Sequence, residues 1–262
     1  MVHPQSPSDS RCLVVAHRGA SAQWPENTLE AFEAAIEEGA DVVELDVRLS
    51  LDGVPVVMHD ADVARSTGGR GLVHELTLPE LKALDAAPGR TGRAEVPTLG
   101  EVLELTSGRV GIDLEIKNIP GDPAFDSPRE GILHAALAEL ERSSYSGEAM
   151  ISSFNTMTIE RSRELAPDVP TGVLTIEAVD APSALAYAQR ADHDWVLPQW
   201  GAVTRAGSEF LAQAHDAGIR VGTWVVDHEA DLRTLFEWEA DAVATNDPRL
   251  AVAVRDQEGR GA

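Results

Sequence analysis

The feature of this chain that most constrains its fold is a repeated alternation of short apolar runs with amphipathic helical patterns. Nearly continuous apolar strands are typical of a parallel sheet that is buried on both faces. Between the runs, apolar residues recur at helical spacing before a glycine, as at Leu29, Phe32, Ile36 and Gly39. This alternation predicts a barrel or a doubly wound sheet. The candidate strands are Leu13–Ala16, Val42–Val47, Val54–His59, Gly111–Ile116, Met150–Phe154, Thr171–Ile176, Trp195–Gln199, Arg220–Val225 and Ala242–Thr245.

These nine candidate strands are one more than an eight-stranded barrel holds. A tight turn at residues 50–53 separates the second candidate from the third, and it is too short for a parallel crossover. Either one of these two strands therefore runs against the barrel, or the second is an extension of its neighbour.

The length of 262 residues suits a single (β/α)8 barrel, which typically needs about 250 residues. We expect one barrel domain over residues 12–252, with a small subdomain inserted at residues 61–97 after the third strand. Glycine-rich turns punctuate this insertion, and a capping box at residues 98–101 opens the next helix. We expect residues 1–11 and 256–262 to be loose tails.

Composition excludes several classes of protein. The formal net charge of −23 repels nucleic acids and anionic membranes, so neither is an expected partner. A single cysteine, Cys12, allows no internal disulfide, and no apolar stretch approaches the roughly 18 residues that span a bilayer. The start of the chain lacks the features of a secretory signal. We therefore expect a cytoplasmic protein without membrane insertion, and the sequence does not indicate its oligomeric state.

Charged residues inside two apolar runs are candidates for chemistry, because a buried charge without a partner is costly. Glu44 and Asp46 are two residues apart, as are Asp113 and Glu115, and on a strand this spacing places both carboxylates on one face. For either strand alone, buried ion pairs are a better explanation than a ligand site. Two strands with the pattern, both toward the ends where barrel sites form, favour a site for Mg²⁺ or Ca²⁺. Lys117, beside them, can neutralise a carboxylate or hold a phosphate oxygen.

His17 and His59 each end an apolar run, where a barrel strand directs side chains into its mouth. A lone histidine there is more often a core residue than a catalyst, but two of them beside charged residues suggest an acid–base pair. The planar guanidinium of Arg18 suits a phosphate. Phe154 and Trp224 also lie at strand ends, where pocket lining and core packing are equally consistent with their type.

Asn27, with Glu30 three residues later, predicts the N-cap of the first helix, but this leaves Glu26 unexplained. The chain contains no H-E-x-x-H, no G-x-S-x-G elbow and no phosphate-binding P-loop. These absences remove many competing α/β enzymes.

Taken in order and spacing, these motifs resemble those of the glycerophosphodiester phosphodiesterase family, from about Leu13 to Leu250. The N-terminal signature comprises His17-Arg18-Gly19, Pro25-Glu26-Asn27-Thr28, Glu44-Leu45-Asp46-Val47, Asp52-Gly53 and His59-Asp60. The later landmarks are Pro97-Thr98-Leu99, Glu115-Ile116-Lys117, Ser153-Phe154, Trp224, Thr245 and Pro248. The ordered set is highly specific, whereas any one piece would be weak.

The resemblance implies a barrel with an insertion after the third strand, and hydrolysis of glycerophosphodiesters to an alcohol and glycerol 3-phosphate. It implies one divalent cation, Mg²⁺ or Ca²⁺, held by Glu44, Asp46 and Glu115. It also implies that His17 and His59 form the acid–base pair. Of the two, we favour His59 as the base and His17 as the acid, although the residues alone do not decide this assignment, or whether water or a neighbouring substrate hydroxyl attacks.

The same resemblance implies that Arg18 and Lys117 bind the phosphate, and we expect Phe154 and Trp224 to contact the substrate. Two departures from the family pattern are Asp227, where an asparagine is frequent, and Asn246, where an aspartate commonly follows the threonine. Both affect the expected pocket rim, and therefore substrate preference more than chemistry.

Three alternative functions account for fewer of these residues. A phospholipase D-like enzyme acting on lysophospholipids or sphingomyelin would need an apolar channel or a membrane-facing patch. A non-catalytic barrel that binds a phosphorylated ligand would be expected to lack a histidine or a metal carboxylate. A glycosidase using paired carboxylates leaves both histidines and both cations without a role.

Overall fold

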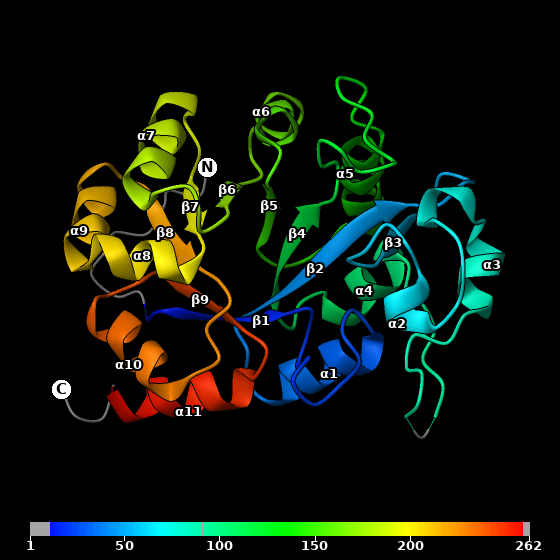
Figure 1. Cartoon of the computed structure of the whole chain (residues 1–262), viewed down its shortest axis with the longest axis horizontal. Helices are drawn as coiled ribbons and strands as arrows, with labels where there is room; N and C mark the ends of the chain where they lie inside the picture. Colours follow the sequence, from blue (N-terminus) through cyan, green and yellow to red (C-terminus); the bar gives the residue numbers. More distant parts are fainter. Residues whose placement is uncertain (1–10, 91, 259–262) are drawn as a thin grey trace.

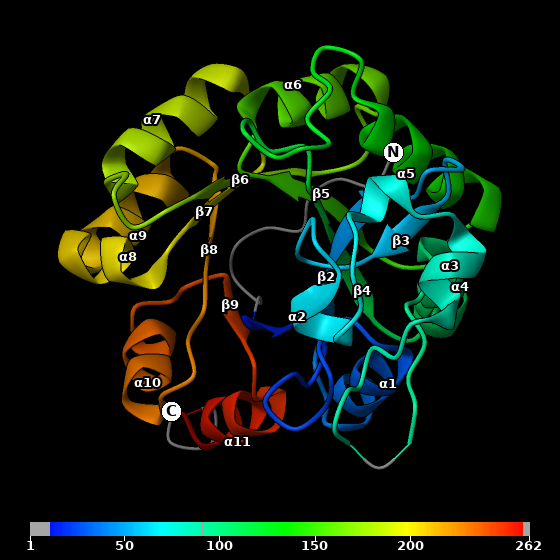
Figure 2. The same ribbon diagram turned by 45° about the vertical axis from the view of Figure 1, so that its right-hand side comes forward.

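The computed structural model describes residues 11–258 except residue 91, and its strands form a closed ring surrounded by helices (Figure 1, Figure 2). The hydrogen-bonded order is β1-β9-β8-β7-β6-β5-β4-β2, and pairing of β1 with β2 closes the ring of eight parallel strands. This confirms the predicted TIM-type barrel and excludes the doubly wound sheet. The barrel strands are β1 (Leu13–His17), β2 (Val42–Leu49), β4 (Gly111–Ile116), β5 (Ala149–Ser153), β6 (Thr171–Thr175), β7 (Trp195–Pro198), β8 (Arg220–Thr223) and β9 (Ala242–Thr245).

Helices follow the strands and form the outer layer of the barrel (Figure 2). Their bounds are α1 (Leu29–Glu37), α4 (Leu99–Thr106), α5 (Gly131–Ser143), α6 (Thr156–Leu165), α7 (Ala181–Ala191), α8 (Trp200–Ala206), α9 (Ser208–Asp216), α10 (Glu229–Glu237) and α11 (Pro248–Glu258). None of the helices in the described ranges is both long enough and apolar enough to cross a bilayer.

The third candidate strand, β3 (Pro55–Val57), is not part of the ring. It pairs antiparallel with the distal part of β2, with Val57 opposite Val47 and Pro55 opposite Leu49. The short turn after β2 allows only this reversal, so the first of the two readings of the nine candidates is correct. Because β3 runs back toward the mouth, it delivers His59 to the site from outside the ring, not from a barrel strand as the sequence suggested.

Residues 61–97 contain α2 (Ala64–Thr67), the 3₁₀ turn η1 (Val73–Glu75) and α3 (Leu78–Ala83). Buried apolar side chains of this segment pack with β3 in a cluster that includes Val56, Val63 and Leu81. Since β3 lies outside the ring, the segment stands between the second and third barrel strands, β2 and β4. The predicted capping box at Thr98 and Glu101 opens α4.

Two helix ends differ from the sequence-based expectation. The N-cap of α1 is Thr28, whose hydroxyl accepts the N–H of Ala31 at 3.2 Å, so the assignment of the cap to Asn27 was wrong. Asn27 has a positive φ of 57° and directs its side chain into the barrel mouth. Residues 256–258, expected in a tail, continue α11, where Glu258 forms an ion pair with Arg233. The expected tails at residues 1–10 and 259–262 lie outside the described residues.

Two clusters of buried apolar side chains occupy different arcs of the barrel. One cluster packs α1, α4 and α5 against β1, β2 and β4, with Phe32 and Leu114 fully buried. The other packs α6 to α11 against β6 to β9, with Phe210 only 1% exposed. Both arcs are therefore anchored by helix–strand packing.

Candidate active site

Three carboxylates from two adjacent barrel strands meet at the mouth. Glu44 and Asp46 point inward from β2, and Glu115 comes from the adjacent β4, where it is in register with Asp46. One oxygen from each lies within 4.8 Å of the other two. All three side chains are buried, so their charges have lost most of their hydration. The structure brings together the three residues proposed as metal ligands.

This oxygen cluster fits a hard divalent cation. Oxygen Oε1 of Glu44 is buried without a hydrogen-bond partner, and burial together with the charges of Asp46 and Glu115 raises its pKa well above the usual value. A divalent cation would satisfy the free oxygen and offset the repulsion among the carboxylates. Carboxylate oxygens are the ligands that Mg²⁺ and Ca²⁺ share, so the donor set does not separate the two ions.

Two cations interleave with the carboxylates. Lys117 Nζ lies 2.8 Å from Asp46 Oδ1 and 2.5 Å from Glu115 Oε1. Arg18 Nε lies 3.2 Å from Asp46 Oδ2, and the backbone N–H of Arg18 donates to Glu44 Oε2 at 2.9 Å. Burial opposes the charge on Asp46, but Lys117 and Arg18 outweigh this effect and lower its pKa. Both cations therefore lie beside the carboxylates, where an anionic substrate would meet them.

His17, at the end of β1, is held through its ring nitrogen Nδ1. Asn246 Oδ1, on the loop after β9, lies 2.8 Å from this nitrogen. Burial and then the charge of Arg18 lower the pKa of His17 to about 4, although the bond to Asn246 opposes the shift. The imidazole is therefore neutral near pH 7, a form in which one nitrogen carries a hydrogen and the other a lone pair.

His59 has a carboxylate partner instead. Its Nδ1 lies 2.6 Å from Asp60 Oδ1, and the other oxygen of Asp60 accepts from Arg65 Nε. Arg65 also forms two bonds to Glu26, which pairs with Arg18 at 3.2 Å. Glu26, unexplained from the sequence, thus links the inserted segment to the barrel mouth.

The two aromatic residues proposed for substrate contact meet across the mouth. Phe154 and Trp224 pack edge to face, with ring centroids 5.4 Å apart and an interplanar angle of 84°. Trp224 Nε1 donates to the carbonyl of Leu197 at 2.9 Å, which fixes the indole. Both rings line the same cavity as the histidines and carboxylates.

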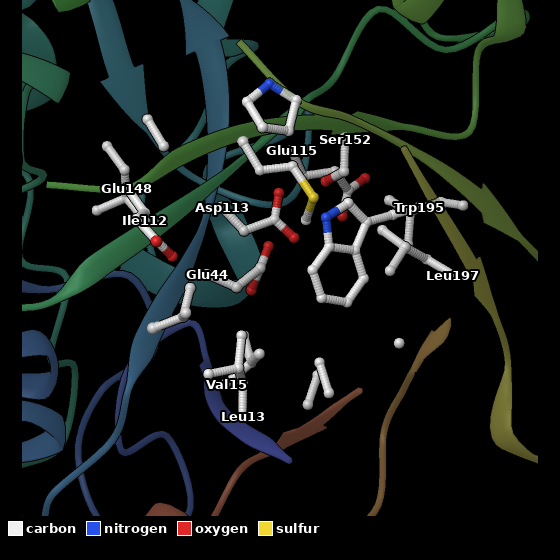
Figure 3. Close-up of a pocket in the computed structure, with 18 of the residues that line it drawn as sticks. Leu13, Val15, Glu44, Ile112, Asp113, Glu115, Glu148, Ser152, Trp195 and Leu197 are labelled. Carbon is white, nitrogen blue, oxygen red and sulfur yellow. The ribbon is translucent and has the colours of Figure 1, made fainter. Parts of the chain in front are cut away.

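The cavity has a volume of about 750 Å³ and extends along the barrel axis. Its upper part, at the carboxyl ends of the strands, contains the proposed site residues. Its lower part, toward their amino ends, is lined by apolar strand residues that include Leu13, Val15 and Leu197, together with Glu148, Asp168 and Arg220. Figure 3 shows the carboxylates of Glu44 and Asp113 directed toward the indole of Trp195. The ionisable and apolar parts of the cavity are therefore continuous.

Asp113, on β4, is a further buried carboxylate, and it is not part of the cluster formed by Glu44, Asp46 and Glu115. Burial and the neighbouring charges of Glu115 and Asp46 raise its pKa to about 7. Among the described residues, Asp113 forms no ion pair that would offset this rise, and a hydrogen bond with Ser152 opposes it only in part.

Sequence reasoning gave three residues of the site too small a role. Asn27 was taken for a helix cap, but its Nδ2 donates to Asp46 Oδ2 at 2.7 Å. Asn246 was placed on the pocket rim, although it contacts His17 directly. Arg65 received no role, and no local pattern marks it, because its partner Glu26 lies 39 residues away. For Asn27, the available signal was its place in the signature-like run of residues 25–28, beside the unexplained Glu26.

Comparison with known proteins places these features in context. Residues 17–250 match the model of the glycerophosphoryl diester phosphodiesterase family. A glycerophosphodiester phosphodiesterase of Caldanaerobacter subterraneus subsp. tengcongensis is 31% identical over 251 residues, which cover 92% of this chain and 97% of the relative. A glycerophosphodiester phosphodiesterase of Bacillus subtilis is 31% identical over 258 residues, with coverages of 93% and 86%.

Solved structures show the same fold. A phosphodiesterase of Oleispira antarctica, solved with the product sn-glycerol-3-phosphate, has a TM-score of 0.83 and 29% identity, covering 93% of this chain and 96% of that one. A glycerophosphodiester phosphodiesterase of Thermotoga maritima has a TM-score of 0.74 and 32% identity, with coverages of 93% and 98%.

Proposed function

The chain belongs to the glycerophosphoryl diester phosphodiesterase family, and we propose that it hydrolyses glycerophosphodiesters to an alcohol and glycerol 3-phosphate. The observation that carries this proposal is the convergence of three buried carboxylates, two cations and two histidines on one cavity. We assign the divalent cation, Mg²⁺ or Ca²⁺, to Glu44, Asp46 and Glu115. The related Oleispira enzyme was solved with sn-glycerol-3-phosphate, which is the product proposed for this chain.

A phosphodiester resists attack because its negative charge repels nucleophiles. When bound, the divalent cation supplies Lewis-acid stabilisation of the charge that develops on the phosphate. Arg18 and Lys117 bind phosphate oxygens and hold the phosphorus in place between the histidines. Phe154 and Trp224 provide an apolar wall against which the carbon atoms of the substrate pack.

His17 and His59 exchange the two protons of the reaction. One imidazole accepts the proton of the attacking hydroxyl, and the other donates a proton to the oxygen of the departing alcohol. The attacking group is water or the adjacent glycerol hydroxyl, which proximity favours and which gives a cyclic phosphate first. In either case the departing alcohol leaves protonated. When the glycerol hydroxyl attacks, a water molecule then cleaves one P–O bond of the cyclic phosphate, so both routes leave the phosphate on glycerol.

Phosphorus NMR of glycerophosphocholine and glycerophosphoethanolamine incubated with the protein tests this proposal. We expect glycerol 3-phosphate to accumulate, and a cyclic phosphate signal would identify attack by the substrate hydroxyl. His17→Ala and His59→Ala should each lower the rate by about 10²–10⁴-fold with an unchanged circular dichroism spectrum. The matched control is His134→Ala on the exposed face of α5. Half the wild-type rate in either site variant would contradict the pairing.

A second candidate substrate is a lysophospholipid, and the observation that favours it is the apolar lower cavity. An acyl chain could occupy the space beside Leu13, Met150 and Ala242. Ala242→Leu would reduce that space without touching the ionisable groups. If lysophosphatidylcholine is the better substrate, this variant should lose its turnover and retain that of glycerophosphocholine. Equal rates on both substrates in the variant would remove this candidate.

A further inference from the structure

Asn246 lies between His17 and Asp227 and connects them through its side-chain amide. Its Oδ1 is 2.8 Å from His17 Nδ1, and its Nδ2 donates to Asp227 Oδ2 at 2.7 Å. Asp227 is itself fixed, because its Oδ1 accepts the backbone N–H of Asn246 at 2.8 Å and the hydroxyl of Thr245 at 3.0 Å. The three side chains thus form a chain of hydrogen bonds that ends at a catalytic imidazole.

The direction of the amide follows from chemistry. An amide has one end that only accepts hydrogen bonds and one that only donates, and a carboxylate only accepts. The end that faces Asp227 must therefore be the NH₂ group, and the carbonyl must face His17. A second donor supports this orientation, since Ser21 Oγ lies 2.9 Å from Asn246 Oδ1.

We propose that Asp227 and Asn246 are positioning residues that fix the tautomer of His17. In this tautomer Nδ1 carries the hydrogen, and Nε2 has a lone pair that faces the proton transferred in the reaction. Because the carbonyl of Asn246 can only accept, Nδ1 must carry the hydrogen. This inference rests on the proposed catalytic role of His17.

The two histidines are consequently oriented by different chemistry. Nδ1 of His59 faces the carboxylate of Asp60, whereas Nδ1 of His17 faces a neutral amide whose orientation a carboxylate sets from behind. Asp227 and Asn246, the two positions at which the sequence departs from the resemblance, therefore face each other across a single hydrogen bond. Exchanging both residues keeps a donor opposite an acceptor, because the amide of an asparagine at 227 can donate to an aspartate at 246.

The test is a double-mutant cycle of Asp227→Asn and Asn246→Asp, with kcat and KM measured on glycerophosphocholine. In Asp227→Asn the oxygen of the new amide still accepts from Thr245 and from the backbone N–H of Asn246, so its NH₂ group faces Asn246. The amide of Asn246 then turns and offers its own NH₂ group to His17. Asn246→Asp opposes two carboxylates. We expect each single variant to lose about 10- to 100-fold in kcat, as is typical when a partner that orients a site histidine is removed. KM should change little, and the double variant should recover to within about threefold of wild type.

Nitrogen-15 NMR of labelled histidine reads the tautomer independently of activity. In wild type and in the double variant, Nδ1 of His17 should carry hydrogen, and in Asp227→Asn the hydrogen should move to Nε2. The matched control, Asp231→Asn on α10, removes a carboxylate outside this chain of hydrogen bonds and should change neither rate nor tautomer. Unchanged single variants, or a double variant no better than the singles, would overturn the inference. Full activity of His17→Ala would instead overturn the proposed function on which it rests.

Discussion

The two arcs of this barrel contribute differently to the site. The first arc, β1, β2 and β4, supplies His17, Arg18 and the four buried carboxylates, and Lys117 follows directly after β4. The second arc, β5 to β9, supplies mainly aromatic rings, small residues and hydrogen bonds that orient groups of the first. Charged groups on adjacent strands neutralise one another and would offset the charge of the proposed cation, whereas the opposite wall is mainly apolar. The comparison indicates that reactivity is concentrated on one arc and that positioning and shape come from the other.

The largest effect is expected from removing a proposed metal ligand from the first arc. Glu115→Gln keeps the shape of the side chain but removes a negative charge from the cluster, and we expect kcat to fall by about 10³-fold. The matched control is Asp113→Asn, on the same strand but outside the cluster, which should retain activity within about tenfold. Steady-state kinetics on glycerophosphocholine distinguish the two. Similar losses in both variants would contradict the assignment of the ligands.

The unpaired carboxylate of the same arc should make stability depend on pH. The pKa of Asp113 is raised to about 7 in the folded protein, against about 4 in an unfolded chain. Its contribution to stability is therefore fully present below about pH 4 and is lost as the pH rises toward 7. Asp113→Asn removes the ionisable group. After EDTA treatment, its free energy of unfolding should exceed that of the wild type by on the order of 1–3 kcal/mol at pH 8, with little difference at pH 4. Urea unfolding at the two pH values measures the difference, and an equal change at both would refute it.

The network around His59 should matter less than the ligands. Burial disfavours the charge on Asp60, but hydrogen bonds from Arg65 and His59 outweigh it and lower its pKa to about 2. Asp60→Asn removes the charge that faces the imidazole, and we expect kcat to fall about tenfold with the fold retained. Asp62→Asn, two residues away in the same segment, is the control. A wild-type rate for Asp60→Asn would show that His59 needs no carboxylate.

The smallest effect is expected from the aromatic wall of the second arc. Phe154→Leu keeps an apolar side chain but removes the edge-to-face contact with Trp224, so KM should rise by about two- to fivefold at unchanged kcat. A fall in kcat without a change in KM would indicate that this wall takes part in the chemical step, and the division between the two arcs would have to be abandoned.

The sequence was most informative where the relevant residues are close together along the chain. Carboxylates two residues apart on a strand share a face. Strand geometry and the family resemblance together therefore predicted that Glu44, Asp46 and Glu115 lie close to one another. The alternation of strands and helices likewise predicted the barrel. The reversal of β3 was one of two stated readings, and only its pairing with β2 decided between them.

The rest of the candidate site depends on contacts between residues that no local sequence pattern indicates. His17 and Asn246 are 229 residues apart, and closure of the ring brings them together. Asn27 looked like a helix cap because asparagine is a favoured cap residue, but Thr28 takes that role and leaves the amide of Asn27 for Asp46. At Asn27, side-chain hydrogen bonding across the mouth prevailed over the local preference for a helix cap.

The most direct test of the central claim is hydrolysis of glycerophosphocholine by wild-type protein and Glu115→Gln after treatment with EDTA, with Mg²⁺ or Ca²⁺ then returned. We predict that the stripped wild type is inactive, that one of the two ions restores release of glycerol 3-phosphate, and that neither restores the variant. Hydrolysis that persists at the full rate after EDTA treatment, or equal restoration of the variant, would contradict a catalytic metal at Glu44, Asp46 and Glu115.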